Sequence, residues 1–366
     1  MTDFDDLFFS GQPEQKPVSV PQQQQQQPED IDDLFHEQRV NRILITVYFV
    51  VQILMAAVMM LMYNREFPNP QEIYDNLVTV NAPTFTISLD ETDPNYPYLV
   101  HVSGDILNAN DRDIPRLIVS IEFYYQNQLL DYIDISEEHV TTNEMMSFDE
   151  SYYFSSEIDE IQYTYSFDFD TAYSVMLNFS QALILGVGFL FIDRYNFKKR
   201  FKEFKSNLSS SMGKIVIGSI MVYGAMIASQ FILNLLGAAE TSQNEETIAS
   251  MFTNDPARLI VLFLLLCVFT PILEEVIYRK VIFGWLDRRF GAPAAIVISG
   301  AIFGLMHVIS YGDFIQSIPY ILMGAVFGYV YHWSKKNIYV TIGVHFVNNF
   351  LAFMLYFLAV MGYGLI

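Results

Sequence analysis

Seven predominantly apolar stretches divide the chain, at about 43–63, 174–193, 214–236, 258–286, 293–311, 318–333 and 338–362. A helix of about 20 residues crosses the roughly 30 Å hydrocarbon core of a bilayer, and only the sixth stretch is clearly short of that length. The pattern therefore predicts a multi-pass α-helical membrane bundle of about seven spans.

Residues 66–172 follow a different pattern, with short segments rich in β-branched and aromatic residues. Examples are 84–89, 98–102, 117–123 and 162–167, and clusters of turn-forming residues at 90–97 and 108–113 separate some of them. This spacing is typical of a small all-β sandwich of about seven strands. We therefore expect an all-β domain inserted between the first and second membrane helices.

Residues 1–40 form an acidic segment that contains six consecutive glutamines, at 22–27, and has no apolar periodicity. Such composition is typical of a disordered tail. The sequence Asp-Asp-Leu-Phe at 5–8 returns at 32–35. The repeat is either a chance occurrence in an acid-rich tail or a duplicated docking peptide for a cytoplasmic partner.

The charges of the 366-residue chain, with a formal net charge of -21, are unevenly distributed. Residues 66–172 hold more than half of the 41 acidic residues, whereas Lys and Arg gather at 39–42, 194–214, 288–289 and 335–336. These positions alternate along the predicted spans, and basic residues are retained on the cytoplasmic side. We therefore expect an integral cell-membrane protein with a cytoplasmic N-terminus and an extracytoplasmic β domain. We expect no nucleic-acid partner, and the single cysteine, Cys267, excludes a disulfide framework.

Several polar side chains lie within the last four predicted spans, where a charge costs several kcal/mol unless it is paired. They are Glu274, Glu275, Arg279, His307, His345 and Asn349. Glu275 and Arg279 are four residues apart, so they can pair on one helix face. Glu274 points about 100° away from Glu275, which leaves it free to face the bundle interior as a general acid or base.

The turn around Gly291 predicts which of these residues meet. Glu274 lies 16 residues before Phe290, and His307 lies 16 residues after Gly291. On antiparallel helices these counts place both side chains at the same depth, roughly 24 Å along the axis from the turn. Small residues at 300–304, 324 and 328 favour close approach of the helices that carry them.

His345 and Asn349 lie four residues apart on one face of the last predicted span. Their depth depends on whether the turn at 335–336 lies deeper than the Gly291 turn or the fourth and fifth helices extend into the cytoplasm. Taken alone, each membrane histidine or asparagine is equally well interpreted as an interhelical hydrogen-bond partner.

Three motifs in this order resemble the CAAX-protease and bacteriocin-processing (CPBP, or Abi) family of intramembrane proteases. They are Glu274-Glu275-x-x-x-Arg279, Phe303-x-x-x-His307 and His345-x-x-x-Asn349. The resemblance covers residues 214–362. Within the family, this part of the chain is similar to type II CAAX prenyl endopeptidases, which cleave the last three residues from prenylated proteins. It implies a protease core that acts on membrane proteins or lipidated peptides.

The resemblance implies that Glu274 and His307 activate the attacking water, that His345 and Asn349 stabilise the oxyanion, and that Arg279 braces Glu275. A second mechanism is open, in which Glu274, His307 and His345 bind a divalent metal such as zinc. The sequence has no His-Glu-x-x-His helix of the zincin type.

Two other classes of protein fit parts of the pattern. A catalytically inactive immunity or scaffold protein would keep the fold and bind peptides through its external domain. A proton-coupled transporter would also use membrane Glu and His residues, but it requires a continuous polar path. The second, third and sixth spans contribute almost no ionisable groups to such a path.

Overall fold

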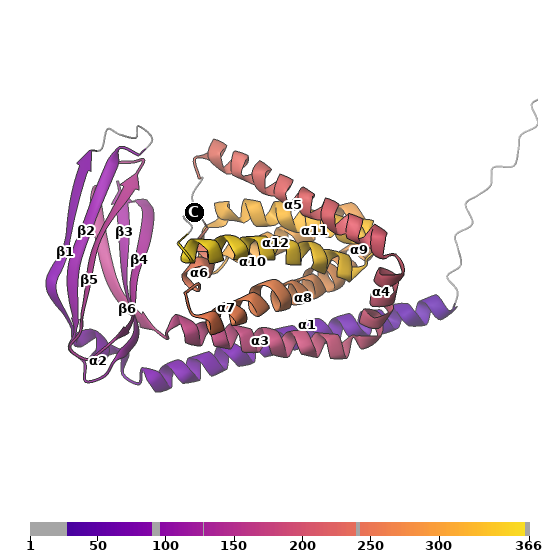
Figure 1. Cartoon of the computed structure of the whole chain (residues 1–366), viewed down its shortest axis with the longest axis horizontal. Helices are drawn as coiled ribbons and strands as arrows, with labels where there is room; N and C mark the ends of the chain where they lie inside the picture. The colour runs from indigo at the N-terminus through magenta and orange to yellow at the C-terminus, as the bar shows by residue number, and fades with distance from the viewer. Residues whose placement is uncertain (1–27, 90–95, 127, 239–241, 363–366) are drawn as a thin grey trace, which may run out of the picture.

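The computed structural model describes residues 28–89, 96–126, 128–238 and 242–362, as a helical bundle with a β domain at one end (Figure 1). The bundle contains α1 (Pro28–Glu66), α3 (Thr171–Ile192), α5 (Leu208–Leu236), α10 (Ala292–Val308), α11 (Ser317–Trp333), α12 (Ile338–Val360) and a long composite helix, Pro256–Phe290. Shorter elements are α2 (Pro70–Asp75), α4 (Arg194–Ser206), α6 (Gln243–Ser250) and the 3-10 turn η4 (Phe314–Gln316).

Within the described residues, six helices are long and apolar enough to cross a membrane, and they contain six of the seven predicted spans to within two residues at the ends. The fifth predicted span, 293–311, corresponds to α10, which has only 17 residues. A helix of that length rises about 26 Å, slightly less than the hydrocarbon core. The protein is thus an integral membrane protein, and a seventh crossing by α10 stays a prediction.

The first helix begins before its predicted start. α1 is continuous from Pro28, inside the segment that composition predicts to be disordered. Proline is favoured in the first turn of a helix, and helix propagates readily outward from an established apolar span. The second Asp-Asp-Leu-Phe sequence, at 32–35, therefore lies on α1, whereas the first, at 5–8, lies outside the described residues.

The β domain consists of two antiparallel three-stranded sheets. One has the order β1 (Leu77–Leu89), β2 (Tyr98–Asn108), β5 (Met145–Phe154), and the other has the order β4 (Gln128–Val140), β3 (Ile114–Tyr125), β6 (Glu160–Asp168). The two sheets share one hydrophobic core, which includes Val102 of β2 and Val119 of β3. The domain is thus a sandwich of six described strands, where about seven were predicted.

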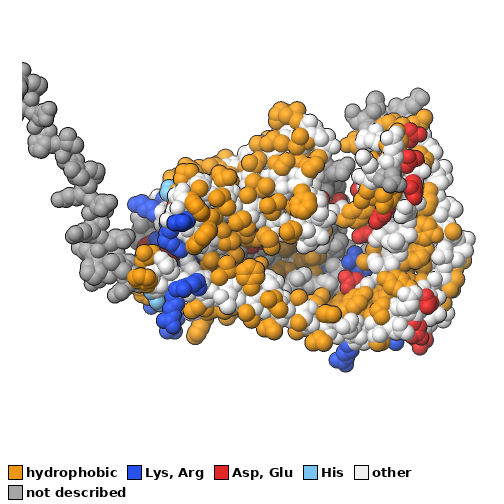
Figure 2. Space-filling view, turned by 180° about the vertical axis from the view of Figure 1, so that it is seen from behind, with side chains coloured by type: hydrophobic (Ala, Val, Ile, Leu, Met, Phe, Trp, Pro, Cys, Tyr) orange, Lys and Arg blue, Asp and Glu red, His pale blue; other side chains and the backbone are white. Residues whose placement is uncertain are grey.

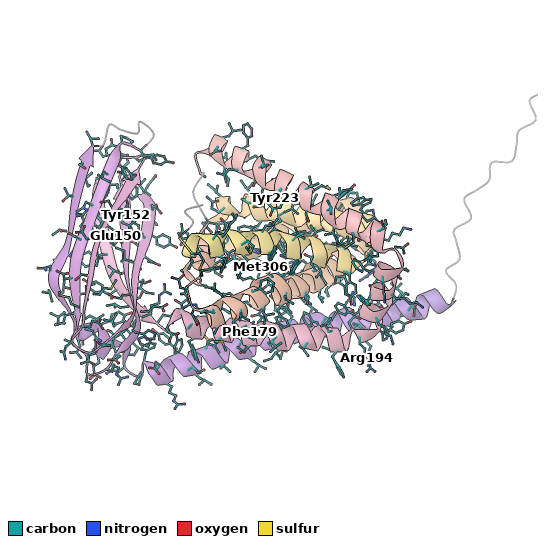
Figure 3. The ribbon with its side chains drawn as sticks, viewed as in Figure 1. Glu150, Tyr152, Phe179, Arg194, Tyr223 and Met306 are labelled. Carbon is teal, nitrogen blue, oxygen red and sulfur yellow. The ribbon has the colours of Figure 1, made fainter. Side chains whose placement is uncertain are left out.

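The β domain and the charged end of the bundle lie at opposite ends of the molecule. Lys and Arg side chains gather at the bundle end far from the β domain (Figure 2). Arg194 lies at that end and Glu150 lies in the β domain (Figure 3). This separation agrees with the predicted topology, in which the β domain is extracytoplasmic, and the sidedness itself stays a prediction.

Glycines bring α10 and α11 into close contact. A Cβ atom on Gly300 would lie 2.7 Å from the backbone nitrogen of Ala325, and one on Gly304 would lie 2.5 Å from that of Ile321. Gly324 faces Gly300 across the same contact. The predicted small-residue faces therefore pack backbone against backbone.

The composite helix Pro256–Phe290 is not a regular α-helix. It runs through α7 (Pro256–Phe263), the π-helical segment η2 (Leu264–Phe269), α8 (Thr270–Glu274), a second π-helical segment η3 (Glu275–Phe283) and α9 (Gly284–Phe290). π-helical segments are rare and are frequent at functional sites. Here η2 precedes the Glu274-Glu275 pair, and η3 begins at Glu275.

Candidate active site

A central cavity of about 460 Å³ lies among the last helices of the bundle. Four of the six polar residues singled out in the sequence line it: Glu274, His307, His345 and Asn349. Tyr223 of α5 and Met306 of α10, labelled in Figure 3, belong to the same lining. Glu275 and Arg279 do not line the cavity, because their side chains are completely buried behind it.

Glu275 and Arg279 form a buried ion pair, with 3.3 Å between Nε of Arg279 and Oε2 of Glu275. None of the guanidinium nitrogens makes a hydrogen bond to the described residues. Instead, the guanidinium carbon lies 5.0 Å from the ring centroid of Phe303 and 5.5 Å from that of Phe327. Cation–π attraction to these desolvated rings offsets part of the cost of burying the charge.

His345 joins the two glutamates. Its Nδ1 lies 3.1 Å from Oε1 of Glu275, and its Nε2 lies 3.6 Å from Oε2 of Glu274. The ring stacks on Phe327, with 4.7 Å between centroids and 22° between planes. Because a carboxylate can only accept, Nδ1 carries a hydrogen and donates it to Glu275, which directs Nε2 towards Glu274 and the cavity.

His307 reaches Glu274 from α10. Its Nε2 lies 4.0 Å from Oε1 of Glu274, as equal helix lengths from the Gly291 turn predict. Its Nδ1 lies 2.8 Å from the carbonyl oxygen of Phe303, so Nδ1 is the donor. The ring stacks on Tyr320 of α11 with a centroid distance of 4.6 Å and an angle of 17°. In the neutral form of His307, the lone pair on Nε2 therefore faces the Glu274 carboxylate.

Asn349 is held by the first π-helical segment. Its Nδ2 donates to the carbonyl oxygen of Leu266 at 2.8 Å, and its Oδ1 accepts from Nδ2 of Asn348 at 3.2 Å. The N–H of Thr270 donates to the carbonyl oxygen of Leu265, five residues earlier. In the same register, the carbonyl oxygen of Leu266 would accept from the N–H of residue 271. That residue is Pro271, which has no N–H, so the Leu266 carbonyl is left for Asn349.

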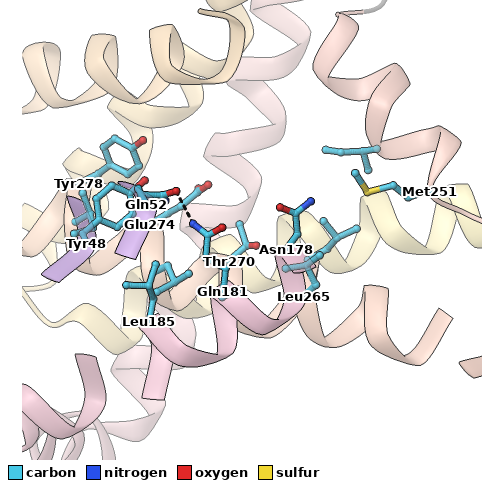
Figure 4. A pocket seen from close by; sticks show the side chains of 15 residues that line it. Tyr48, Gln52, Asn178, Gln181, Leu185, Met251, Leu265, Thr270, Glu274 and Tyr278 are labelled. Carbon is cyan, nitrogen blue, oxygen red and sulfur yellow. Dashed lines mark hydrogen bonds between the residues drawn. The ribbon is translucent and has the colours of Figure 1, made fainter. Parts of the chain in front are cut away.

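A second pocket reaches Glu274 from the side of α1 and α3 (Figure 4). This α1–α3 pocket has a volume of about 360 Å³, and its polar lining includes Tyr48, Gln52, Asn178 and Gln181. Nε2 of Gln181 donates to Oε1 of Gln52, the bond drawn dashed in Figure 4. None of these residues was predicted from the sequence, although uncharged amides in the first two apolar stretches are a usable signal.

Glu274, His307 and His345, the three residues of the metal alternative, lie together, and both imidazoles present Nε2 to the Glu274 carboxylate. In the described part of the chain, no three His, Cys, Asp or Glu side chains are placed to hold a metal ion. The Nδ1 atoms of the two imidazoles bond to the Phe303 carbonyl and to Glu275, so both rings keep Nε2 for a water molecule or a metal ion. The choice between the glutamate and metal mechanisms stays a prediction.

The fold and site define a class: a polytopic membrane protein with a carboxylate between two imidazoles in a cavity among its helices. Comparison with known families agrees, because residues 256–351 match the family model described as "Type II CAAX prenyl endopeptidase Rce1-like". Together with the relatives below, this match shows that residues 256–351 are similar to CAAX-type membrane peptidases.

The curated relatives match about a third of this chain. The chain is 32% identical over 130 residues to "Putative membrane peptidase YdiL" of Bacillus subtilis (strain 168), covering 36% of this chain and 50% of the relative. It is 31% identical over 134 residues to "Membrane-embedded CAAX protease MroQ" of Staphylococcus aureus (strain USA300), covering 36% and 51%. The chain thus spans about half the length of these curated relatives, and no solved structure matches it.

Proposed function

We propose that the protein is an intramembrane endopeptidase that hydrolyses peptide bonds of membrane-associated or lipidated proteins and peptides. The observation that carries the proposal is the convergence of Glu274, His307, His345 and Asn349 on one cavity. The family match of residues 256–351 supports the protease class, and the names of the relatives in Bacillus and Staphylococcus agree with it.

In this mechanism Glu274 and His307 hold the attacking water. Oε1 of Glu274 and Nε2 of His307 are 4.0 Å apart, too far for a direct hydrogen bond, and both are acceptors when the imidazole is neutral. A water molecule that donates one hydrogen to each is oriented with its lone pairs towards the substrate carbonyl. Glu274 takes one proton as the oxygen attacks and later delivers it to the leaving amine.

His345 and Asn349 stabilise the oxyanion that forms on the substrate carbonyl. One hydrogen of the Asn349 amide is used by Leu266, which leaves the other for the oxyanion. His345 donates through Nε2 in its imidazolium form, because its Nδ1 hydrogen is committed to Glu275. Removal of one such donor typically costs about 2.7–4 kcal/mol of transition-state stabilisation.

We assign the remaining parts of the chain to substrate and partner contacts. The apolar walls of the central cavity, which include Met323 and Phe353, suit an apolar peptide or lipid-modified segment. The β domain is proposed to lie outside the cell, and the Asp-Asp-Leu-Phe sequences to bind a cytoplasmic partner. Phe35 of the second sequence supports this, because it is 63% exposed.

The proposal is tested with the full chain in detergent and a mixture of synthetic apolar peptides, with new peptide ends identified by mass spectrometry. We expect cleavage by the wild-type protein and losses of about 100-fold or more in the Glu274→Gln, His307→Ala and His345→Ala variants. His332→Ala is the matched control, because His332 is exposed and outside the cavity, and it should cleave normally. Equal cleavage by all four variants would exclude this mechanism and favour a binding or scaffold protein.

A further inference from the structure

A groove between α1 and α9 lies at the basic end of the bundle, separate from the central cavity. It has a volume of about 620 Å³ and is lined by Arg42 on α1 and by Trp285, Arg288 and Arg289 on α9. Its deeper wall is apolar and includes Ile45 and Val281. The groove thus combines a cationic rim with an apolar floor.

The three arginines of this groove are exposed and have no carboxylate partner within the described part of the chain. Among the described residues, none of them takes part in an ion pair. The neighbouring carboxylate of Asp287 is already neutralised by Lys336, at 2.6 Å. Three guanidinium groups around one concave site, without ion-pair partners among the described residues, favour an anion, and guanidinium geometry matches phosphate well.

The position of the groove indicates where that anion comes from. Arg42 lies at the start of the apolar part of α1, and Arg288 and Arg289 lie at the end of the composite span. Trp285 is 58% exposed, as interfacial tryptophans are at the level of lipid headgroups. A phosphate at the rim would therefore lie at headgroup depth, with acyl chains continuing along the apolar floor.

A buried polar group in the same groove is also unsatisfied. Asn41 is 5% exposed, and its Nδ2 reaches the carbonyl oxygen of Lys280 at 3.5 Å. Its Oδ1 has no hydrogen-bond partner among the described residues. A buried acceptor without a partner is costly, and a hydroxyl of a lipid headgroup would satisfy it.

We propose that the α1–α9 groove is a specific binding site for an anionic phospholipid, whose phosphate is held by Arg42, Arg288 and Arg289. Basic pockets between membrane helices on the cytoplasmic side recognise anionic headgroups in this way. The bound lipid would fill the space between α1 and the helix segment that carries Glu275 and Arg279. The site is independent of whether the protein cleaves peptides.

The test uses the full chain with Trp333→Phe, which leaves Trp285 as the only tryptophan. Fluorescence of Trp285 is measured in neutral detergent against acyl-chain-brominated phosphatidylglycerol and, in parallel, brominated phosphatidylcholine. We expect saturable quenching by phosphatidylglycerol at a concentration about tenfold or more below that of phosphatidylcholine. Equal quenching by the two lipids would overturn the proposal.

Two triple variants separate a site from diffuse attraction. Arg42→Gln with Arg288→Gln and Arg289→Gln should remove the preference for phosphatidylglycerol. Lys198→Gln with Lys199→Gln and Lys202→Gln makes the same charge change on exposed residues of α4 outside the groove, and it should preserve the preference. Equal losses in both triple variants would show diffuse attraction and contradict a site.

Two further measurements complete the test. If the groove triple variant does not fold, Arg289→Gln alone should weaken phosphatidylglycerol binding about fivefold, since one basic group near anionic lipid contributes about 1 kcal/mol. Unchanged binding would count against the site.

Competition with inorganic phosphate distinguishes a lipid phosphate from a free phosphate as the source of the anion. Displacement of the brominated lipid by equimolar phosphate would indicate a free-anion site and overturn the lipid assignment.

Discussion

Glu275 contacts two buried groups, the guanidinium of Arg279 and the imidazole of His345. Its Oε2 faces Arg279 and its Oε1 faces His345, and the side chain itself is fully buried. The sequence predicts only the first of these contacts, because four residues along a helix bring the pair onto one face. In the structure, the same carboxylate that neutralises the arginine also orients the imidazole beside Glu274.

This double role predicts different effects on stability and activity. Arg279→Met alone should destabilise the protein by about 3–5 kcal/mol, because it leaves the Glu275 charge buried without its cation. Glu275→Leu combined with Arg279→Met should recover much of that loss, since an apolar pair of similar volume replaces the ion pair. Thermal unfolding in detergent measures both effects.

Activity should not recover in the double variant, because His345 loses the acceptor that orients it. Peptide cleavage should stay about 100-fold or more below wild type, even where the unfolding temperature returns. A double variant with both normal stability and normal cleavage would show that Glu275 does not position His345.

At the scale of elements, the contact between α10 and α11 fixes where His307 lies. Gly304 is one turn before His307, and a Cβ at this position would lie 2.4 Å from Cγ1 of Ile321 and 2.5 Å from its backbone nitrogen. The ring that stacks on His307 belongs to Tyr320, the residue before Ile321. Separation of these helices would therefore displace both rings together.

We expect Gly304→Ala to lower the free energy of unfolding by about 1–3 kcal/mol, the usual cost of overpacking. Cleavage should fall with it, because His307 moves away from Glu274. Gly224→Ala on α5 is the matched control, since nothing lies within 4 Å of its added Cβ. The two variants are compared by thermal unfolding and peptide cleavage, and equal behaviour would mean that the contact is not rigid.

At the scale of the whole molecule, Glu138 connects the β domain to the bundle. This residue of β4 accepts hydrogen bonds from the backbone N–H of Thr171, at 3.0 Å, and from the Thr171 hydroxyl, at the start of α3. Burial alone would raise the pKa of the Glu138 carboxyl, but these bonds together with Arg258 and Arg116 outweigh burial and lower it. The ionised form is therefore favoured in the folded protein.

The lowered pKa of Glu138 gives a pH dependence with a definite sign. A carboxyl with a lowered pKa in the folded state stabilises the protein above its unfolded pKa of about 4.3, and this contribution is lost as pH falls through the folded pKa. Wild type should unfold at a higher temperature than Glu138→Gln near neutral pH, and the difference should close below about pH 4. Glu150→Gln, at an exposed position of β5, is the control. A difference that persists undiminished at low pH would contradict the assignment.

Much of the architecture follows from local patterns in the sequence. Apolar runs predict the membrane helices because a helix must bury about 20 residues in hydrocarbon, and the β-branched segments predict strands such as β2 and β3. The Glu275–Arg279 pair follows from helical spacing, and equal lengths on either side of Gly291 place Glu274 and His307 at the same level, where they approach to 4.0 Å. These features depend on short stretches of chain.

Other features were decided only by the tertiary structure. The partners of His345, the bond from Asn349 to Leu266 and the α1–α3 pocket join residues that are far apart in sequence. Their geometry depends on how each helix is rotated, and the π-helical segments around Glu274 change that rotation from the regular 100° per residue. The sequence thus determined which groups lie on the apolar helices, and it placed Glu274 and His307 at matching distances from the Gly291 turn. Only packing of the helices against one another decided which atoms face each other.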